Sequence, residues 1–195
     1  RILGPNCLGL LVPGLGLNAS FAPGGAQPGA LAFATQSGAL ATAMLDWANS
    51  RALGFSHFIS MGDSADADFG DVLDWLGSDA HPGAALVCRE TGRDGPNFMR
   101  APRAGAGNKR VIVVKAGRAP EGARAAASHT GALAGSDSVF DAAVHRAGML
   151  RVDTLDALFD AAETLARARA PKGPRLVLLT NGGGAGVLAA DALAL

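Results

Sequence analysis

The stretch 30-ALAFATQSGALATAMLDWA-48 decides the fold, because its hydrophobic pattern changes at one point. Its first six residues, 30–35, form the compact apolar run that is typical of a parallel strand buried on both faces. The run ends at a polar Gln-Ser-Gly turn, in which Ser37 is a good N-cap for a helix over 38–52. The stretch therefore predicts a strand that leads directly into a helix.

The same alternation of short apolar runs and longer amphipathic runs continues along the chain. Further strands are predicted at 55–60, 84–89, 110–116 and 176–180, with a shorter run at 149–152. Further helices are predicted at 68–78, at 136–148, and at 153–170 with Asp153 as the cap. Strands that alternate with helices indicate an α/β fold with a mostly parallel sheet.

Composition excludes several classes of protein. The 195 residues carry a formal net charge of zero, so the basic surface typical of nucleic-acid binding is missing. The two cysteines, Cys7 and Cys88, form no CxxC pair, which favours a reducing compartment over a disulfide framework or a zinc site. The longest apolar stretch contains Gln36 and Asp46, so no membrane span is expected and the cytoplasm is the expected location.

The chain is expected to be a piece of a longer protein with more than one domain. Residues 1–27 are rich in Gly and Pro and suggest the tail of a preceding domain followed by a linker. Residues 28–170 hold the repeated strand and helix pattern of one α/β domain. After the Pro-Lys-Gly-Pro linker, residues 174–195 suggest the start of another α/β domain.

Several chemically useful residues follow the predicted strands. The carboxyl ends of parallel strands lie at one edge of a sheet, where ligands bind in open α/β folds. Ser37 follows the first strand, Glu90 follows the strand 84–89, and a Gly/Ala-rich loop with His129 follows the strand 110–116. We therefore expect these three residues to meet at that edge.

Their chemistry is complementary. The start of the helix after Ser37 offers unpaired N–H groups that suit a phosphoryl group, and Gly38 lets an anion approach closely. His129 is a nucleophile if an acceptor such as Glu90 holds its other ring nitrogen. Alone, a loop histidine more often has no special role, and Glu90 is then a strand-end carboxylate.

A second Gly-rich turn, 180-TNGGGAGVLAAD-191, also leads into a predicted helix. It is an anion site by the same reasoning, although its third glycine does not fit the dinucleotide-binding GxGxxG pattern. A tight connection between strand and helix explains it equally well.

The chain resembles the NDP-forming acyl-CoA synthetases, relatives of succinyl-CoA synthetase. The matching segments are GPNCLG (4–9), ATQSGALATAMLDWA (34–48), the glutamate in CRETGRDG (88–95), VVKAGR (113–118), SHTGALAGSDSVFDAA (128–143) and LTNGGGAGVLAADAL (179–193). Two positions depart from the family pattern. Asp63 stands where an asparagine is expected, and Thr91-Gly92 replaces the usual Gly-Ile.

The resemblance implies a role for each matching residue. His129 aligns with the histidine that carries the phosphoryl group, and Glu90 aligns with the glutamate that orients it. The helix starts that hold phosphate correspond to Gln36, Ser37 and Gly38 on one side and to Gly182, Gly183 and Gly184 on the other. Asn6 and Cys7 lie in the segment that closes the CoA-binding domain.

The resemblance also implies a flavodoxin-like, doubly wound parallel sheet and the reaction acyl-CoA + NDP + phosphate ⇌ acid + CoA + NTP. The whole protein would use CoA, ATP or ADP, and magnesium, but no metal held by this chain. It would act on acyl-CoA and phosphate, work with an ATP-grasp domain or subunit, form an oligomer, and bind neither nucleic acid nor membrane.

Two alternatives stay open at this level. Some relatives are fused to a GNAT-type acetyltransferase, and residues 16–23 and 139–166 resemble that branch, in which the synthetase-like part is a regulatory module that senses acyl-CoA. A flavodoxin-like interaction domain without any ligand is the other alternative.

Overall fold

The computed structural model describes residues 1–79, 83–90, 95–104, 109–130, 135–168, 173 and 175–194. For residues 101–104, 109, 129 and 130 the description covers the backbone alone.

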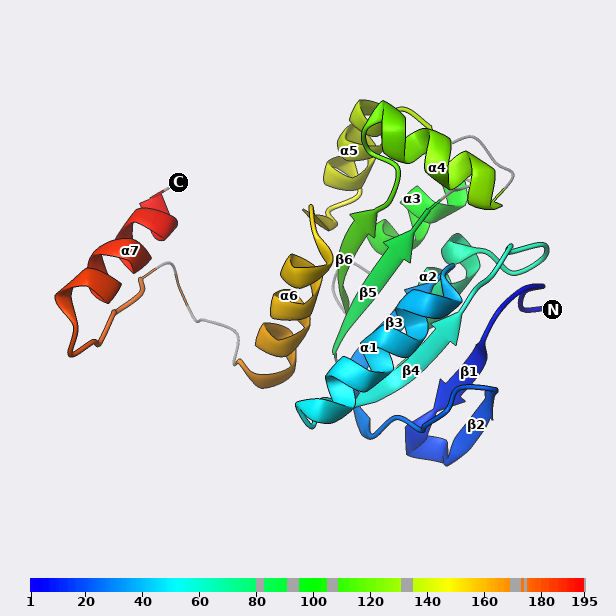
Figure 1. Ribbon diagram of the computed structural model, residues 1–195, viewed down its shortest axis with the longest axis horizontal. Coiled ribbons are helices and arrows are strands. Elements are labelled where there is room, and N and C mark those ends of the chain that lie inside the picture. The colour runs from blue at the N-terminus through cyan, green and yellow to red at the C-terminus, as the bar shows by residue number, and fades with distance from the viewer. Residues whose placement is uncertain are drawn as a thin grey trace.

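Seven strands form one sheet in the order β2-β1-β4-β3-β5-β6-β7 (Figure 1). The strands are β1 (Gly9–Val12), β2 (Leu17–Ser20), β3 (Pro28–Thr35), β4 (Phe55–Ser60), β5 (Gly83–Arg89), β6 (Lys109–Lys115) and β7 (Leu150–Val152). All neighbours from β4 to β7 are parallel, whereas β1 pairs antiparallel with both β2 and β4. The sheet is therefore parallel except at one edge, as the sequence predicts.

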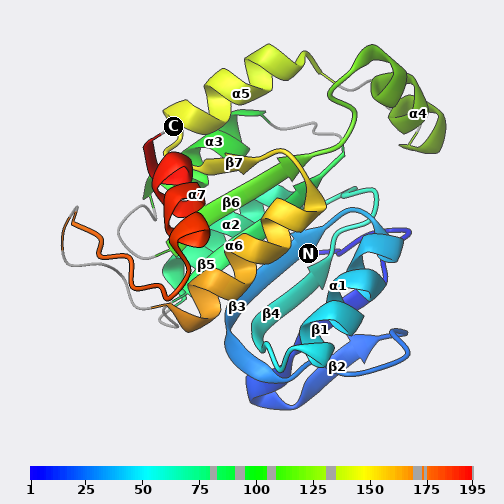
Figure 2. The same ribbon diagram turned by 60° about the vertical axis from the view of Figure 1, so that its left-hand side comes forward.

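Helices cover both faces of the sheet (Figures 1 and 2). They are α1 (Gly38–Ser50), α2 (Phe69–Ser78), α3 (Gly95–Ala104), α4 (Pro120–Thr130), α5 (Asp137–Arg146), α6 (Leu155–Arg167) and α7 (Gly183–Ala194), with a short 3-10 turn, η1 (Pro13–Leu15). Alternate side chains of the strands point to opposite faces, so Phe33 packs with α1 and α6 while Ala34 packs with the α2 side. The fold is doubly wound and flavodoxin-like, with one core layer on each face of the sheet.

Side-chain caps set the starts of α1, α2 and α6. Ser37 caps α1, since its hydroxyl accepts a hydrogen bond from the Leu40 N–H. Asp68 and Asp71 form a reciprocal capping box at the start of α2. The predicted cap of α6 is wrong by one residue, because the Thr154 hydroxyl rather than Asp153 accepts from the Ala157 N–H.

Two predictions about the chain's elements are corrected, and one segment holds more structure than predicted. Residues 1–27 contain β1 and β2, which extend the sheet, and their assignment as the tail of a preceding domain stays a prediction. Residues 176–180 form no strand, because no strand in the described part of the chain lies beside them to complete a hydrogen-bonded ladder. The stretch after β6 is the helix α4 rather than a loop.

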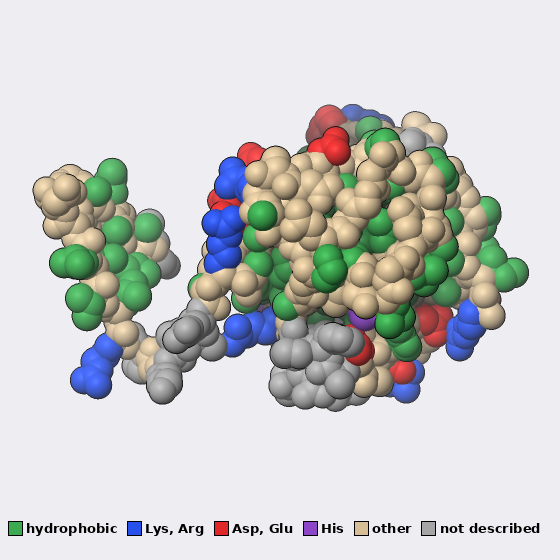
Figure 3. Space-filling view, turned by 90° about the horizontal axis from the view of Figure 1, so that it is seen from below, with side chains coloured by type: hydrophobic (Ala, Val, Ile, Leu, Met, Phe, Trp, Pro, Cys, Tyr) green, Lys and Arg blue, Asp and Glu red, His purple; other side chains and the backbone are tan. Residues whose placement is uncertain are grey.

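The segment that ends in α7 lies apart from the sheet in Figure 1. None of the residues of α7 is buried, and Leu176, Val177 and Leu179 are exposed. Hydrophobic side chains accordingly cover the corresponding lobe at the left of Figure 3. Among the described residues, no helix is both long enough and apolar enough to cross a membrane.

Leu158 in α6 tests the packing of the helical layer, because its side chain is fully buried against the sheet. We expect Leu158→Ala to lower the free energy of unfolding by about 2–5 kcal/mol, since the substitution leaves a cavity. Denaturant unfolding measures this change. Leu15→Ala is the matched control, because Leu15 is 81% exposed, and a change within about 0.5 kcal/mol is expected there. Equal losses in the two variants would contradict the packing described.

Candidate functional site

The carboxyl ends of the parallel strands meet at one edge of the sheet, as predicted. Backbone hydrogen bonds continue past the strands themselves. The Met61 N–H donates to the Thr35 carbonyl at 2.7 Å, and the Ala116 N–H donates to the Arg89 carbonyl at 3.0 Å. The turns that follow β3, β4, β5 and β6 are therefore held side by side.

Gln36 and Glu90 are in direct contact at this edge. The backbone N–H of Glu90 donates to the side-chain oxygen of Gln36 at 2.9 Å, and the Gln36 N–H donates to the Cys88 carbonyl at 3.4 Å. Both residues are half-buried. The structure thus brings together two of the predicted site residues that lie on different strand ends.

The start of α1 leaves backbone N–H groups available. The Ser37 N–H donates to the Thr35 hydroxyl, and the Leu40 N–H donates to the Ser37 hydroxyl. Within the described part of the chain, the N–H groups of Gly38 and Ala39 have no such partner, as is normal for the first turn of a helix. A Cβ atom on Gly38 would meet nothing within 4 Å, so an anion can approach these N–H groups.

The segment with Asn6 and Cys7 packs against the turn after β4. The Asp63 N–H donates to the Pro5 carbonyl at 3.0 Å, and the Leu8 N–H donates to the Ser60 hydroxyl at 2.9 Å. Gly62 has a φ of 56°, and a Cβ atom there would lie 2.1 Å from the Pro5 oxygen, so only glycine allows this approach. The structure therefore brings Asn6 and Cys7 to the end of the strand next to β3.

Asp63, which departs from the family pattern, has a local partner. Its carboxylate accepts a hydrogen bond from the Asn6 side-chain amide at 3.4 Å. The negative charge of Asp63 is exposed to solvent and faces the Asn6 amide. Both features reduce the free-energy cost of placing a carboxylate at this position. Thr91-Gly92, the other departure, lies outside the described residues.

Cys88 lies two residues before Glu90, but its thiol is unreactive at neutral pH. Desolvation by burial, helped by the negative charge of Glu90, raises the pKa of the Cys88 thiol to about 12. The thiolate is the reactive form of cysteine, so Cys88 is a packing residue of β5 and not a nucleophile at neutral pH.

His129 is the residue before the last of α4, and only its backbone is described. Both Figures 1 and 2 place α4 beyond the tips of β5 and β6, and Glu90 directly follows β5. The predicted loop is therefore wrong, and the meeting of His129 with the other site residues stays a prediction. The contacts of the imidazole lie outside the described residues.

Gly182, Gly183 and Gly184 lie at the start of α7. Gly182 closes a small turn in which its N–H donates to the Thr180 hydroxyl at 3.0 Å, and α7 begins at Gly183. This helix start lies apart from the sheet in Figure 1. The second predicted anion site is thus a helix start, and its part in phosphate binding stays a prediction.

The sequence analysis missed an ion-pair cluster at the ends of β6 and β7. Arg151 donates two hydrogen bonds to the Asp137 carboxylate at 2.7 and 2.8 Å, and Lys115 lies 3.6 Å from the same carboxylate. Desolvation tends to raise the pKa of Asp137, but the hydrogen bonds and charge of Arg151, together with Lys115 and Arg118, hold that pKa below its ordinary value. The sequence does show Lys115 and Arg118 in the segment VVKAGR and Asp137 in the segment AGSD. Their spacing in the sequence does not indicate that they form ion pairs.

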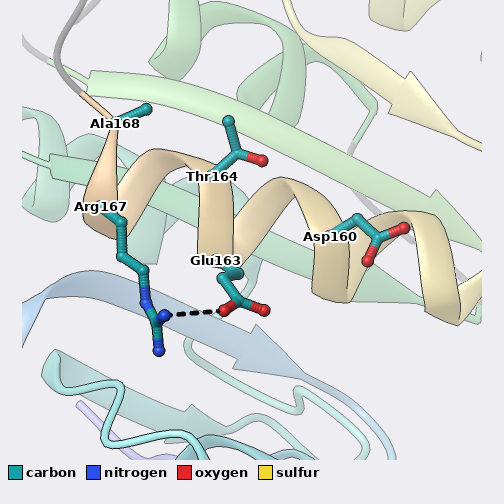
Figure 4. A pocket seen from close by; sticks show the side chains of 5 residues that line it. All are labelled: Asp160, Glu163, Thr164, Arg167 and Ala168. Atoms are coloured by element: carbon teal, nitrogen blue, oxygen red, sulfur yellow. Dashed lines mark ion pairs between the residues drawn. The ribbon is translucent and has the colours of Figure 1, made fainter. Parts of the chain in front are cut away.

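The hollow drawn in Figure 4 is remote from these groups. Its lining residues come from the second half of α6 and are Asp160, Glu163, Thr164, Arg167 and Ala168. Arg167 donates a hydrogen bond to the carbonyl of Arg51, the residue that ends α1. The hollow therefore lies near the end of α1, whereas the candidate site lies at the start of that helix. Glu163, which lines the hollow, already forms ion pairs with Arg51 and Arg167. The hollow is not the candidate site.

No group of three or more His, Cys, Asp or Glu side chains suitable for a metal ion occurs within the described ranges. The candidate site thus consists of the open helix start at Ser37–Gly38, Gln36 with Glu90, the Asn6–Cys7 segment and the α4 backbone that bears His129.

A protein-family model and the similar proteins of known function all point to the CoA ligases. The family model described as "Succinyl-CoA ligase like flavodoxin domain" matches residues 28–165. The chain is 44% identical over 98% of its length to the alpha subunit of acetate–CoA ligase [ADP-forming] I from Pyrococcus furiosus, and 41% identical to acetate–CoA ligase [ADP-forming] I from Archaeoglobus fulgidus. It spans 42% and 28% of the lengths of these two relatives.

A solved structure agrees with this likeness. Dinucleotide forming acetyl-coenzyme A synthetase 1 from Ca. Korarchaeum cryptofilum, in complex with phosphate and ADP, superposes with a TM-score of 0.94 at 39% identity. The match covers 100% of this chain and 42% of that chain.

The raised pKa of Cys88 predicts how its thiol responds to alkylation. With Cys7→Ser in place, we expect iodoacetamide at pH 8 to leave Cys88 unmodified in the folded protein, because its pKa of about 12 leaves roughly one thiolate in ten thousand. Mass spectrometry after labelling measures this. In urea the same cysteine should react fully, and rapid labelling of the folded protein would contradict the burial.

Proposed function

The chain belongs to the family of succinyl-CoA ligase like flavodoxin domains, and from this premise we propose that it is the corresponding part of an ADP-forming acyl-CoA ligase. The 44% identity over nearly the whole chain to an acetate–CoA ligase subunit supports this activity. The complete protein would convert acyl-CoA, ADP and phosphate into the free acid, CoA and ATP.

The single observation that carries the proposal is the contact of Gln36 with Glu90. It joins the open start of α1, which suits a phosphoryl group, to a strand end that bears a carboxylate. The backbone of α4 with His129 lies at the same edge. A phosphate dianion, a carboxylate and a nucleophilic ring are the components that phosphoryl transfer through histidine requires.

In the proposed sequence, a phosphate oxygen attacks the thioester carbon, the C–S bond breaks, and CoA leaves as an acyl phosphate forms. A ring nitrogen of His129 then attacks phosphorus, so an N–P bond forms while the P–O bond to the acyl group breaks and the carboxylic acid leaves. Glu90 accepts a hydrogen bond from the other ring nitrogen and stabilises the positive charge that develops there. An oxygen of ADP finally takes the phosphoryl group and restores the ring.

The N–H groups of Gly38 and Ala39 hold the transferred group while it is in this site, and Gln36 and Ser37 keep that helix start in place. Asn6 and Cys7 take part in binding CoA near its thiol. Gly182, Gly183 and Gly184 supply a further phosphate-binding helix start. Magnesium neutralises nucleotide phosphates when bound, and the described residues of this chain hold no acidic cluster for it.

The domains, the nucleotide-binding partner and the location of the complete protein are also proposals. Residues 1–27 connect to a CoA-binding domain, residues 28–170 form the ligase domain, and residues 174–195 begin the next α/β domain. An ATP-grasp domain or subunit provides the nucleotide site, and the complete protein is an oligomer that works in the cytoplasm. The relatives reported above are acyl-CoA ligases, so the comparisons do not support the acetyltransferase alternative.

Labelled phosphate tests the phosphohistidine directly. The full-length protein with its nucleotide-binding partner is incubated with acetyl-CoA and [32P]phosphate, and the label on the protein is tested for lability in acid and stability in base. We expect label on His129 in the wild type and none in His129→Ala, because the N–P bond needs the ring nitrogen. Glu90→Gln should slow labelling by about 10²-fold or more, since the orienting charge is lost.

His145→Ala is the matched control, because His145 lies exposed on α5 and should leave labelling unchanged. Equal label in the wild type and His129→Ala, or no label in either with a partner present, would overturn the proposed function.

A further inference from the structure

Helix α4 has no fully buried side chain in the part whose side chains the structure describes. It contains 11 residues, and none of residues 120–128, whose side chains the structure describes, is buried. Its described side-chain hydrogen bonds stay within the helix, from Arg124 to Glu121 and from Ser128 to the Arg124 carbonyl. A helix of this length is marginal alone in water, so its placement depends on what holds its two ends.

One cluster joins the chain that precedes α4 to the start of α5. The chain leaves the sheet after Lys115 and rejoins the body at Asp137, the first residue of α5. The Lys115 ammonium group donates to the Gly117 carbonyl at 3.2 Å and lies 3.6 Å from the Asp137 carboxylate. Lys115 therefore touches the outgoing and the returning chain at the same time, and its side chain is only 6% exposed.

Two arginines strengthen this connection. Arg151 of β7 binds the Asp137 carboxylate with two hydrogen bonds, and its side chain is also 6% exposed. Arg118, two residues before α4, lies 2.8 Å from the Asp153 carboxylate and 4.0 Å from that of Asp137. The chain before α4 and the start of α5 are thus tied to the ends of β6 and β7.

The cluster also reaches the strand that bears Glu90. The Phe140 ring lies 5.8 Å from the Lys115 ammonium group, 5.6 Å from the Arg151 guanidinium and 5.9 Å from that of Arg89. Arg89 directly precedes Glu90 and packs over Phe98 at 4.2 Å. The base of α4 and the position of Glu90 therefore share one packed unit.

The three cations of the ion-pair cluster are matched by three carboxylates, so the cluster differs from an anion-binding site. The cations Lys115, Arg118 and Arg151 face the carboxylates of Asp137, Asp141 and Asp153. Each of these three cations therefore already faces a carboxylate. Asp137 is the shared member, because all three cations lie within 4.0 Å of it.

We propose that Asp137, held by Lys115 and Arg151, is a positioning residue that sets where α4 presents His129 relative to Glu90. The role in phosphoryl transfer rests on the proposed function, whereas the anchoring of α4 does not. Loss of the Asp137 charge leaves two buried cations with one partner fewer, which loosens the chain before α4 and the start of α5 together.

The test uses the full-length protein with its nucleotide-binding partner and compares Asp137→Asn with the wild type. We expect the rate of His129 labelling at saturating substrates to fall roughly 10- to 100-fold, because a displacement of about 1 Å is costly for a reacting group. The KM for phosphate should stay unchanged, since phosphate binds at the start of α1. Hydrogen exchange should speed up over residues 120–130 and stay unchanged in β3 and β5.

Asp156→Asn is the matched control, because Asp156 also lies in the first turn of a helix but is exposed. Neither labelling nor exchange should change in it. Asp137→Glu keeps the charge and should recover most of the labelling rate. If Asp137→Asn does not fold, Arg118→Gln replaces it, since Arg118 is 41% exposed and its loss leaves Asp137 paired; a smaller, several-fold effect on labelling and exchange is then expected.

Unchanged exchange over residues 120–130 in the folded variant would overturn the anchoring. Faster exchange without any loss of labelling rate would overturn the positioning role. If the wild type takes no label, the proposed function fails and the positioning role with it, while hydrogen exchange still decides the anchoring of α4.

Discussion

The hydrogen bond from the Glu90 backbone to the Gln36 side chain is the contact on which the candidate site depends. Parallel strands end at one edge of a sheet, but each turn that follows can move independently unless polar groups join them. The Gln36 oxygen accepts the Glu90 N–H, so the turn after β3 and the turn after β5 become one unit. The start of α1 and the backbone of Glu90 are thereby held side by side.

The sheet itself makes this contact possible. Residues Leu31–Thr35 of β3 and all of β4 are buried, and helices on both faces keep water away from the ladder. Polar chemistry is then confined to the strand ends, at the helix start after Ser37 and the turn around Gly62. The segment with Asn6 and Cys7 joins the same edge because Gly62 leaves room for the Pro5 carbonyl.

Much of this arrangement could be predicted from the sequence, for identifiable reasons. The central strands are continuous apolar runs, and Ser37 is a strong local cap, so β3, α1 and the edge with Glu90 were correctly predicted. The strand at 176–180 was wrong, because an apolar run is a strand only if a neighbour completes its ladder. Helix α4 was missed since its alanines sit among Gly and Ser and show no apolar face. The Lys115, Asp137 and Arg151 cluster joins residues far apart in the sequence, which no local pattern encodes.

The central claim is that a phosphoryl group is held between the start of α1 and Glu90. A crystal structure of the full-length protein with bound phosphate tests it most directly. The account predicts phosphate oxygens at about 3 Å from the N–H groups of Gly38 and Ala39, with the Gln36 to Glu90 hydrogen bond intact and the His129 ring facing the ion. A phosphate bound elsewhere, with this helix start left to water alone, would contradict the account.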